Sequence, residues 1–311
     1  MNYPEGHWQI NQGVMNTGLG SVNFNGPVSF GPDPTTGSEP DGRKPSHAGR
    51  AGQWHLGVIT VLSEETMAVS RVLARACAYR QREHSNGLRF EEATIDSAGK
   101  HVKVVATRAL ETGQLSASIA FDRLCETYAP AVVAMTGIAG SIHQSVRLGD
   151  VVVAYEVISY DQRKETPAGA SRRGTSLQVP ATVRHAINNF FSDNGEPCQV
   201  STTDPDGTTR TFSVRPGIIG SGNAVVADAA SDIRKYVASF NDKTLALETE
   251  TGGIGQAFYE KADGSAATGW LAIRGISDHA DPDKDDRFHD IAAWHAAVVL
   301  ERLAPYLVPG N

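Results

Sequence analysis

The 311-residue chain has little of several features that define common classes of protein. Its three cysteines, Cys77, Cys125 and Cys198, are odd in number and far apart, which excludes a disulfide framework and a C-x-x-C metal pair. The first residues lack a positively charged start followed by an apolar core, and no run of eighteen apolar residues occurs anywhere. We therefore expect a reduced, cytoplasmic protein.

Basic charge is also scarce. The 28 Lys and Arg are outnumbered by 35 Asp and Glu, so the formal net charge is −7. Such a balance offers no general electrostatic reason to bind nucleic acid or an anionic membrane surface. We predict neither kind of partner, and any basic site must be local.

The composition changes near residue 53. Residues 1–52 are rich in Gly, Asn, Ser and Pro, and the segment DPTTGSEPDGRKPSHAGRAG at their end cannot support a core. We predict an assembly segment at 1–34, a flexible linker at 35–53 and a globular domain at 54–308.

From Trp54 onward, short apolar runs alternate with helical patterns. Strands are expected at 55–62, 102–107, 131–136, 150–159, 214–220, 244–248 and 270–276. Helices are expected at 63–79, 119–128, 182–191, 228–240, 254–260 and 289–303. Strands that are nearly all apolar are covered by helices on both faces, and their ligands sit beyond the carboxyl ends of the strands. The pattern predicts an α/β protein whose site lies just after several strands.

Two of these strand ends carry carboxylates. After the first strand, Ser63 can cap the next helix, and Glu64 and Glu65 occupy its first turn. Simple helix stabilisation is an open alternative there, because acids are common in first turns. The strand 244–248 ends in Glu248, and the Gly252-Gly253 pair that follows indicates close packing against the backbone.

The stretch RGISDHADPDKDD at 274–286 holds five aspartates. Three of them have the D-x-D-x-D spacing of a calcium loop, but Asp286 and Ala292 stand where that loop needs glycine and glutamate. Calcium is therefore disfavoured, and the trailing aspartates are expected to cap the last helix and face water. Asp278 differs, because it ends an apolar strand. Partial burial would raise its pKa above the ordinary value of about 3.9 and let it hold a proton to donate.

Five motifs in order resemble a known family: VLSEE, TGIAGSIHQSVRLGDVVVAYEVISYD, GSGNAVVAD, LALETE and RGISDHAD. The chain is similar to the purine nucleoside phosphorylase and uridine phosphorylase superfamily, in its branch like methylthioadenosine/S-adenosylhomocysteine nucleosidase. The resemblance covers nearly everything after Trp54. It implies a three-layer fold with a central mixed, twisted sheet flanked by helices. We expect no cofactor and no metal.

The same resemblance assigns roles. Glu65 would position the attacking water, Glu248 would hold the ribose hydroxyls, and Ser277 with Asp278 would contact the purine. The other residues expected to line the substrate site are Ala139, Gly140, Val225, Val226 and Leu247. Two positions depart from the family pattern: Asn223 stands where an acid is frequent, and Leu247 stands where methionine is usual.

These roles describe cleavage of a purine N-glycosidic bond. Asp278 would protonate N7 of the leaving base while Glu65 deprotonates a water at the anomeric carbon, and Glu248 would orient the sugar. Superfamily phosphorylases place arginines at two positions that here hold residues 63–65 and 134–136, which contain none. Hydrolysis is therefore expected rather than phosphorolysis.

The basic run QRKETPAGASRR bears on the substrate. Its Y-x-x-x-K-E-T context resembles nucleosidase domains of bacterial and fungal immune effectors, some of which remove adenine from ATP. We predict that Lys164 and Arg172 meet the phosphates of an adenine nucleotide such as ATP. A solvated loop, a methylthioadenosine/S-adenosylhomocysteine nucleosidase and a non-catalytic nucleoside sensor are the alternatives. The three retained acids argue against the sensor.

Residues 10–31 alternate hydrophobic with Asn, Gln, Ser and Gly, and no charge occurs from Ile10 to Pro32. Copies stacked in register could pair every backbone group and form Asn ladders. A disordered tail is the alternative, because Gly and Pro27 weaken strands. The segment resembles N-terminal amyloid signalling motifs, which implies a receptor protein with a matching motif. We also expect a homo-oligomer, a dimer or larger.

Overall fold

The chain divides into two units, Met1–Ala48 and Gly49–Asn311. The computed structural model describes residues 9–10, 14–16, 22–24, 54–97, 99–167, 169–261, 267–282 and 286–308. In the first unit, an antiparallel sheet has the order β1 (Gln9–Ile10), β2 (Val14–Asn16), β3 (Val22–Phe24). The predicted linker at 35–53 and the remainder of 1–34 lie outside the described residues.

The described part of the second unit contains an 11-stranded mixed sheet. Its main path is β12 (Thr175–Gln178), β9 (Val151–Ser159), β14 (Thr209–Ser221), β15 (Thr244–Glu248), β8 (Val132–Ser141), β4 (Leu56–Thr60), β7 (Lys100–Arg108), β6 (Arg89–Ser97) and β5 (Cys77–Glu83). Off this path, β13 (Cys198–Thr203) pairs with β14, and β16 (Gly269–Asp278) pairs with both β8 and β9. The strands β8, β9, β14, β15 and β16 therefore close into a ring.

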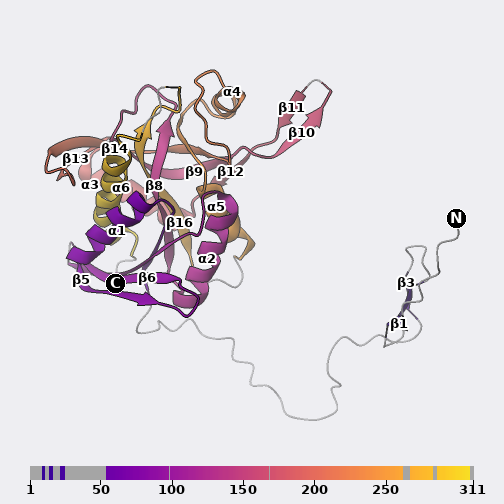
Figure 1. Ribbon diagram of the computed structural model, residues 1–311, viewed down its shortest axis with the longest axis horizontal. Helices are drawn as coiled ribbons and strands as arrows, with labels where there is room; N and C mark the ends of the chain where they lie inside the picture. The colour runs from indigo at the N-terminus through magenta and orange to yellow at the C-terminus, as the bar shows by residue number, and fades with distance from the viewer. Residues whose placement is uncertain are drawn as a thin grey trace, which may run out of the picture. The chain divides into compact units, whose positions relative to one another are not determined.

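Helices cover both faces of this sheet. They are α1 (Ser63–Arg75), α2 (Gln114–Tyr128), α3 (Ala181–Asn194), α4 (Asp232–Phe240), α5 (Thr251–Glu260) and α6 (His289–Leu303), followed by the 3-10 turn Ala304–Tyr306. In Figure 1, α1, α3 and α6 lie to one side of the central strands, and α2 and α5 lie to the other. The predicted fold, a central mixed sheet flanked by helices, is confirmed.

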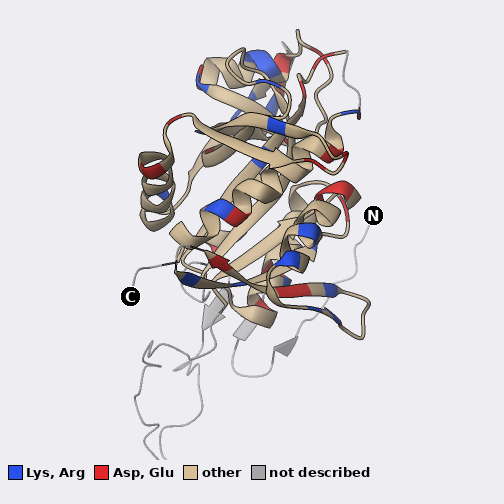
Figure 2. Cartoon of the chain, turned by 90° about the vertical axis from the view of Figure 1, so that its left-hand side faces the viewer, with Lys and Arg blue, Asp and Glu red and all other residues tan. Residues whose placement is uncertain are grey.

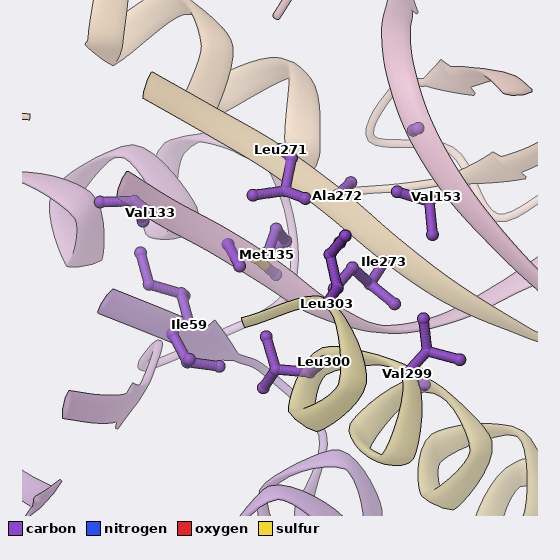
Figure 3. Close-up of a cluster of buried hydrophobic side chains, with 14 of the residues drawn as sticks. Ile59, Val133, Met135, Val153, Leu271, Ala272, Ile273, Val299, Leu300 and Leu303 are labelled. Atoms are coloured by element: carbon purple, nitrogen blue, oxygen red, sulfur yellow. The ribbon is translucent and has the colours of Figure 1, made fainter. Parts of the chain in front are cut away.

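The core forms where α6 meets the sheet. Figure 3 shows this contact, with Ile59, Val133, Met135, Val153, Leu271, Ala272 and Ile273 of the strands near Val299, Leu300 and Leu303 of the helix. A Cβ atom at Gly275 would lie 2.0 Å from the carbonyl oxygen of Ala292. Glycine is therefore required for β16 to pack directly on the backbone of α6.

Local structure differs from the sequence expectation in three places. The first helix ends at Arg75 rather than at residue 79, because residues from Cys77 onward pair with β6 as the exposed edge strand β5. Its N-cap is Leu62 and not Ser63, and the N-cap of α6 is Phe288 rather than an aspartate. The sequence pattern does not predict the polar strands β5, β10 (Arg163–Thr166) and β11 (Gly169–Arg172), because their side chains are almost all exposed and they contain no apolar run.

Charged residues of both signs are interspersed along the helices and strands, as Figure 2 shows. The net acidity of the chain is therefore spread out rather than gathered on one element. In the described ranges, no helix combines the length and the apolar character needed to cross a bilayer.

Candidate active site

A cavity of about 250 Å³ opens where β8, β15 and β16 end and α1 begins. Its walls contain the predicted residues Glu65, Ala139, Gly140, Val225, Val226, Leu247, Glu248, Ser277 and Asp278. The structure thus brings together every predicted site residue except Lys164 and Arg172. Residues that the sequence reading did not single out, among them Glu250 and His289, also line it.

Glu65 is held by the backbone. One carboxylate oxygen, Oε2, accepts hydrogen bonds from the amides of Val61 at 2.8 Å and Leu62 at 2.9 Å. The other, Oε1, accepts from the amide of Ile138 at 2.9 Å. A Cβ atom at Gly137 would lie 2.2 Å from this Oε1, so glycine is required beside it. Glu65, only 3 % exposed, is therefore oriented before any ligand arrives.

Arg274 is a fully buried cation behind the cavity. Its guanidinium bonds to Glu248, and it lies 3.3 Å from an oxygen of Glu250 and 3.8 Å from an oxygen of Glu65. Burial lowers the pKa of Arg274, but the three carboxylates outweigh burial and raise it. The sequence reading missed this residue, although an arginine within the apolar strand WLAIRGI signals buried acidic partners.

Glu248 and Glu250 have different surroundings. The Oε2 atom of Glu248 accepts from the backbone amides of Glu250 and Thr251, from the hydroxyl of Thr251 and from Arg274. Glu250 accepts from the amide of Gly113 at 3.1 Å and from the hydroxyl of Thr249. The side chain of Glu250 is 7 % exposed and that of Glu248 is 1 % exposed. Glu248 is bound mainly by the start of α5 and by Arg274, whereas Glu250 has more access to the cavity.

The pKa of Glu250 is raised. Burial is the largest cause; Arg274 opposes the rise, and Glu248 and Glu65 add to it. Glu250 therefore carries its charge in the folded protein less readily than a carboxylate in water does.

Asp278 lies at the end of β16 and is 4 % exposed. Its carboxylate accepts from the hydroxyl of Ser277 and from the amide of Ala280, both at 2.8 Å. The pairing of β16 with β8 changes register between Ile276 and Asp278, and such bulges re-aim side chains. A Cβ atom at Gly140 would lie 2.6 Å from Oδ1 of Asp278. The burial expected for Asp278 is present.

Asn223, which departs from the family pattern, joins three segments near the rim. Its amide and its side-chain nitrogen both donate to Oδ2 of Asp161 at 2.7 Å, and its side-chain oxygen accepts from the amide of Gln114 at 3.1 Å. These bonds occupy the side chain. Asn223 therefore holds the loop that carries Val225 and Val226.

Lys164 and Arg172 lie on a separate two-stranded sheet, β10 (Arg163–Thr166) and β11 (Gly169–Arg172), which extends away from the sheet core (Figure 1). Lys164 is exposed, and Arg172 donates to the carbonyl of Tyr160 at 3.3 Å. Arg163 faces Arg172 across the ladder and pairs with Glu165 at 2.5 Å. Neither predicted phosphate contact lines the cavity.

No group of three or more His, Cys, Asp or Glu side chains within the described ranges is arranged to hold a metal ion. Acidic groups dominate the cavity, and its described lining contains no Lys or Arg. The chemistry available there is that of buried carboxyl groups, backbone amides, the hydroxyls of Thr112, Thr249 and Ser277, and the imidazole of His289.

This fold and this set of strand-end carboxylates define a class. Residues 55–307 match the model of the Phosphorylase superfamily, and the chain belongs to that family. The expected superfamily is confirmed. Within the described residues, all the elements that build the cavity lie in the matched range.

Two kinds of relative are similar in sequence. One is the ATP nucleosidase Cap17 of Escherichia coli (strain KTE188), 28 % identical over 266 residues, covering 81 % of this chain and 51 % of that protein. The chain thus spans about half the length of that relative. The other is the 5'-methylthioadenosine/S-adenosylhomocysteine nucleosidase of Shewanella baltica (strain OS185), 27 % identical over 258 residues, covering 82 % of this chain and 98 % of that protein.

Solved structures show the same fold. The 5'-methylthioadenosine/S-adenosylhomocysteine nucleosidase of S. pneumoniae has a TM-score of 0.63 at 21 % identity, covering 82 % of this chain and 100 % of that one. The futalosine hydrolase of Helicobacter pylori strain 26695 has a TM-score of 0.62 at 14 % identity, covering 81 % and 97 %.

Proposed function

We propose that the protein is a purine nucleosidase that hydrolyses the bond between base and ribose. The observation that carries the proposal is the placement of two buried carboxyl groups, Glu65 and Asp278, in one cavity. Glu65 contacts Ile138, and Asp278 lies beside Gly140. Both contacts are on β8, two residues or roughly 7 Å apart along the strand. The two carboxyl groups therefore reach the cavity at neighbouring points of one strand.

Asp278 acts as the acid on the leaving base. It has the hydroxyl of Ser277 as a partner at 2.8 Å. Because a hydroxyl can donate or accept, Ser277 can remain bonded to Asp278 before and after the proton moves to purine N7. The apolar side chains of Val225, Val226 and Leu247 supply a surface for the flat base.

Glu65 acts on the attacking water. Three backbone amides hold its carboxylate, so it needs no rearrangement when the water binds. Arg274, 3.8 Å away, offsets part of the negative charge of Glu65 and of its acidic neighbours. A carboxylate held in this way can orient the water and accept its proton as the sugar becomes cationic.

The ribose hydroxyls need a carboxylate acceptor near Glu65. The sequence assigns this role to Glu248. The geometry adds Glu250, because Oε2 of Glu248 is already bonded to the start of α5 and to Arg274. We assign the direct contact with the ribose hydroxyls to Glu250. Glu248 instead binds the guanidinium of Arg274 and holds it in place.

Water, and not phosphate, is the proposed nucleophile. The described lining of the cavity contains four carboxylates and no Lys or Arg, and Arg274 is occupied by carboxylates. A phosphate ion would be repelled by these groups and would lack a bidentate partner.

The proposed substrate is an adenine nucleotide such as ATP. The similarity to a protein named an ATP nucleosidase supports it, as do Lys164 and Arg172 on the β10–β11 hairpin as candidate phosphate contacts. On this proposal the protein is an effector of a bacterial immune or signalling system. A methylthioadenosine/S-adenosylhomocysteine nucleosidase is the second candidate, favoured by the near-complete coverage of such a relative.

A chromatographic screen tests both candidates. The purified protein is incubated with ATP, AMP, adenosine, methylthioadenosine, GTP and uridine, and free base is measured with and without inorganic phosphate. We expect adenine release from ATP that phosphate does not accelerate. Release only from methylthioadenosine would select the second candidate, and binding without release of any base would support the sensor.

We also propose a homo-oligomer. Leu110, Leu115 and Ile119 are 88 %, 74 % and 45 % exposed and line a groove that shares Thr112 with the active-site cavity. Contiguous exposed apolar side chains of this kind mark protein contacts. A Leu115→Glu variant should lower the solution mass, and Thr127→Glu, at the far end of the same helix, should not.

The N-terminal segment is proposed to drive assembly with a receptor that carries a matching motif. The short antiparallel strands β1 to β3 support its tendency to pair as strands. A peptide of residues 8–34 should form thioflavin-positive fibrils with a spacing of about 4.7 Å between strands. A peptide that stays monomeric at high concentration, even when seeded, would refute assembly and leave the catalytic proposal intact.

A further inference from the structure

His295 is a buried titratable side chain that lies outside the active-site cavity. It is on α6 and is 1 % exposed. Its Nδ1 atom lies 2.6 Å from the carbonyl oxygen of Gly149, and its Nε2 atom lies 2.9 Å from Oδ1 of Asp204. The ring also stacks on Phe212, with centroids 3.8 Å apart and planes 10° from parallel. The imidazole is therefore fixed on both edges and on one face.

Asp204 is itself fixed. Its side chain is fully buried, and its second oxygen pairs with Nη1 of Arg210 at 2.5 Å. Arg210 also pairs with Asp206 at 2.9 Å in the same β13–β14 turn. Carbonyl and carboxylate oxygens accept hydrogen bonds but do not donate them, so both contacts of His295 form together when each ring nitrogen carries a hydrogen. Arg210, Asp204, His295 and Gly149 thus form one continuous chain of contacts.

Gly149 connects this chain to the strand end that carries Asp278. The amide of Gly149 donates to the carbonyl of Ile276 at 2.8 Å, and the amide of Ile276 donates to the carbonyl of Asp150 at 2.8 Å. Ile276 stands immediately before the register shift that re-aims Asp278. The two backbone bonds therefore fix the strand at the residue from which the bulge begins.

His295 also lies against the backbone of Gly149. The φ of +82° at Gly149 is open to glycine, and the ring of His295 lies 3.4 Å from the place of an added Cβ. The same face of α6 touches β16 one turn earlier, where Ala292 meets Gly275. His295 is therefore the polar end of the contact by which α6 supports the last residues of β16.

We propose that His295 is a positioning residue for Asp278, acting through Gly149 and Ile276, with Asp204 and Arg210 holding the imidazole. The inference rests on the proposed role of Asp278 as the acid. An acid that protonates the leaving base acts in the transition state, so its displacement lowers kcat and leaves KM almost unchanged. A displacement of about 1 Å from the reacting geometry can cost on the order of 100-fold in rate.

Two substitutions separate the two contacts of the imidazole. In the His295→Asn variant, the side-chain amide nitrogen can take the place of Nδ1 and keep the bond to Gly149. In the His295→Gln variant, the amide nitrogen takes the place of Nε2 and keeps only the contact with Asp204. We expect kcat for base release to fall roughly 10- to 100-fold in the Gln variant, with KM within about twofold. The Asn variant should stay within about threefold of wild type.

Phe212→Leu is the matched control, because it removes the stacked ring without touching Gly149. It should lower the melting temperature while leaving kcat of the folded protein near wild type. Hydrogen exchange gives a readout that does not need activity: the Ile276 amide should exchange faster in His295→Gln than in Phe212→Leu. If His295→Gln does not fold, Asp204→Asn, which keeps the volume and weakens the hold on Nε2, is measured in the same way.

The outcomes separate this inference from the proposed function. Equal losses of kcat in the Asn and Gln variants, or wild-type kcat in a folded Gln variant, would overturn the role of His295. Equal losses in Phe212→Leu and His295→Gln at matched melting temperature would also overturn it. A wild-type protein that releases no base would refute the proposed function, and the exchange rate of Ile276 would still decide whether His295 fixes the strand end.

Discussion

The active-site cavity, with Arg274 behind it, and the β10–β11 hairpin hold acidic and basic side chains in opposite settings. Glu65 lines the cavity and Arg274 lies behind it; both are almost fully buried, and they lie 3.8 Å apart. On the hairpin, Lys164 is exposed and Arg163 pairs only with its neighbour Glu165. The first region holds its charges in one geometry before a substrate arrives, and the second does not.

This difference has an energetic meaning. Water and salt screen the interaction between buried charges only weakly. Removing one partner of a buried pair therefore leaves the other charge buried with no opposite charge beside it. Exposed pairs contribute little to stability, and salt screens them. Substitutions in the cavity should therefore change rate or stability strongly, and substitutions on the hairpin should change mainly how a charged substrate binds.

The largest expected effect is on catalysis. Glu65→Gln and Asp278→Asn should each reduce base release by roughly 100- to 10,000-fold, because each removes a group that moves a proton. Steady-state kinetics of adenine release measures this. Glu64→Gln and Asp286→Asn are the neighbouring controls and should retain activity. A folded Glu65→Gln or Asp278→Asn variant with wild-type turnover would show that the assigned mechanism is wrong.

The next effect is on stability. Arg274→Met should lower the free energy of unfolding by about 3–5 kcal/mol, because Glu65, Glu248 and Glu250 would lose their shared cation. Urea unfolding followed by circular dichroism measures it. Arg89→Met removes an exposed pair with Glu83 and should cost less than about 1 kcal/mol. Equal losses in the two variants would mean that the buried cluster is not held by its arginine.

Glu250 links activity to pH-dependent stability. The pKa of Glu250 is higher in the folded protein than in the unfolded chain, where it has the ordinary value near 4.5. The contribution of Glu250 to stability is therefore fully present below that ordinary pKa and is lost as the pH rises through the folded pKa. Glu250→Gln should therefore gain stability relative to wild type as the pH increases from 5 to 8, while KM for the nucleoside rises. Melting temperatures across that range measure the first effect.

Glu248→Gln is the comparison for Glu250→Gln, since Glu248 is bonded mainly to the start of α5 and to Arg274. It should affect folding more than KM. A stability difference between Glu250→Gln and wild type that shrinks with rising pH would contradict the raised pKa. A larger KM effect at Glu248 than at Glu250 would return the ribose contact to Glu248.

The smallest effect is expected on the hairpin. Lys164→Ala together with Arg172→Ala should raise KM for ATP more than KM for adenosine, and added salt should reduce the difference. Kinetics on both substrates at low and high ionic strength measures it. Equal changes on ATP and adenosine would remove the reason to place these side chains near phosphates.

Much of the site follows from the sequence. Glu65, Glu248 and Asp278 were identified because each directly follows or ends an apolar segment, and strand ends of this kind meet at one edge of a sheet. Glu250 and Arg274 were missed. The sequence places Arg274 within an apolar strand and gives no sign that Glu250 faces a cavity, because partners such as Gly113 for Glu250 and Glu65 for Arg274 are distant in sequence.

The sequence by itself determined the class of fold, because apolar periodicity distinguishes strands from helices. It also determined which catalytic groups are present, because a carboxyl group can act as an acid or a base. Only the tertiary structure decided which of the acids share Arg274, and that the hairpin cations lie outside the cavity. It also decided that His295 joins Asp204 to Gly149. These contacts join residues far apart along the chain, and their geometry depends on the register and bulge of strands that the sequence pattern does not specify.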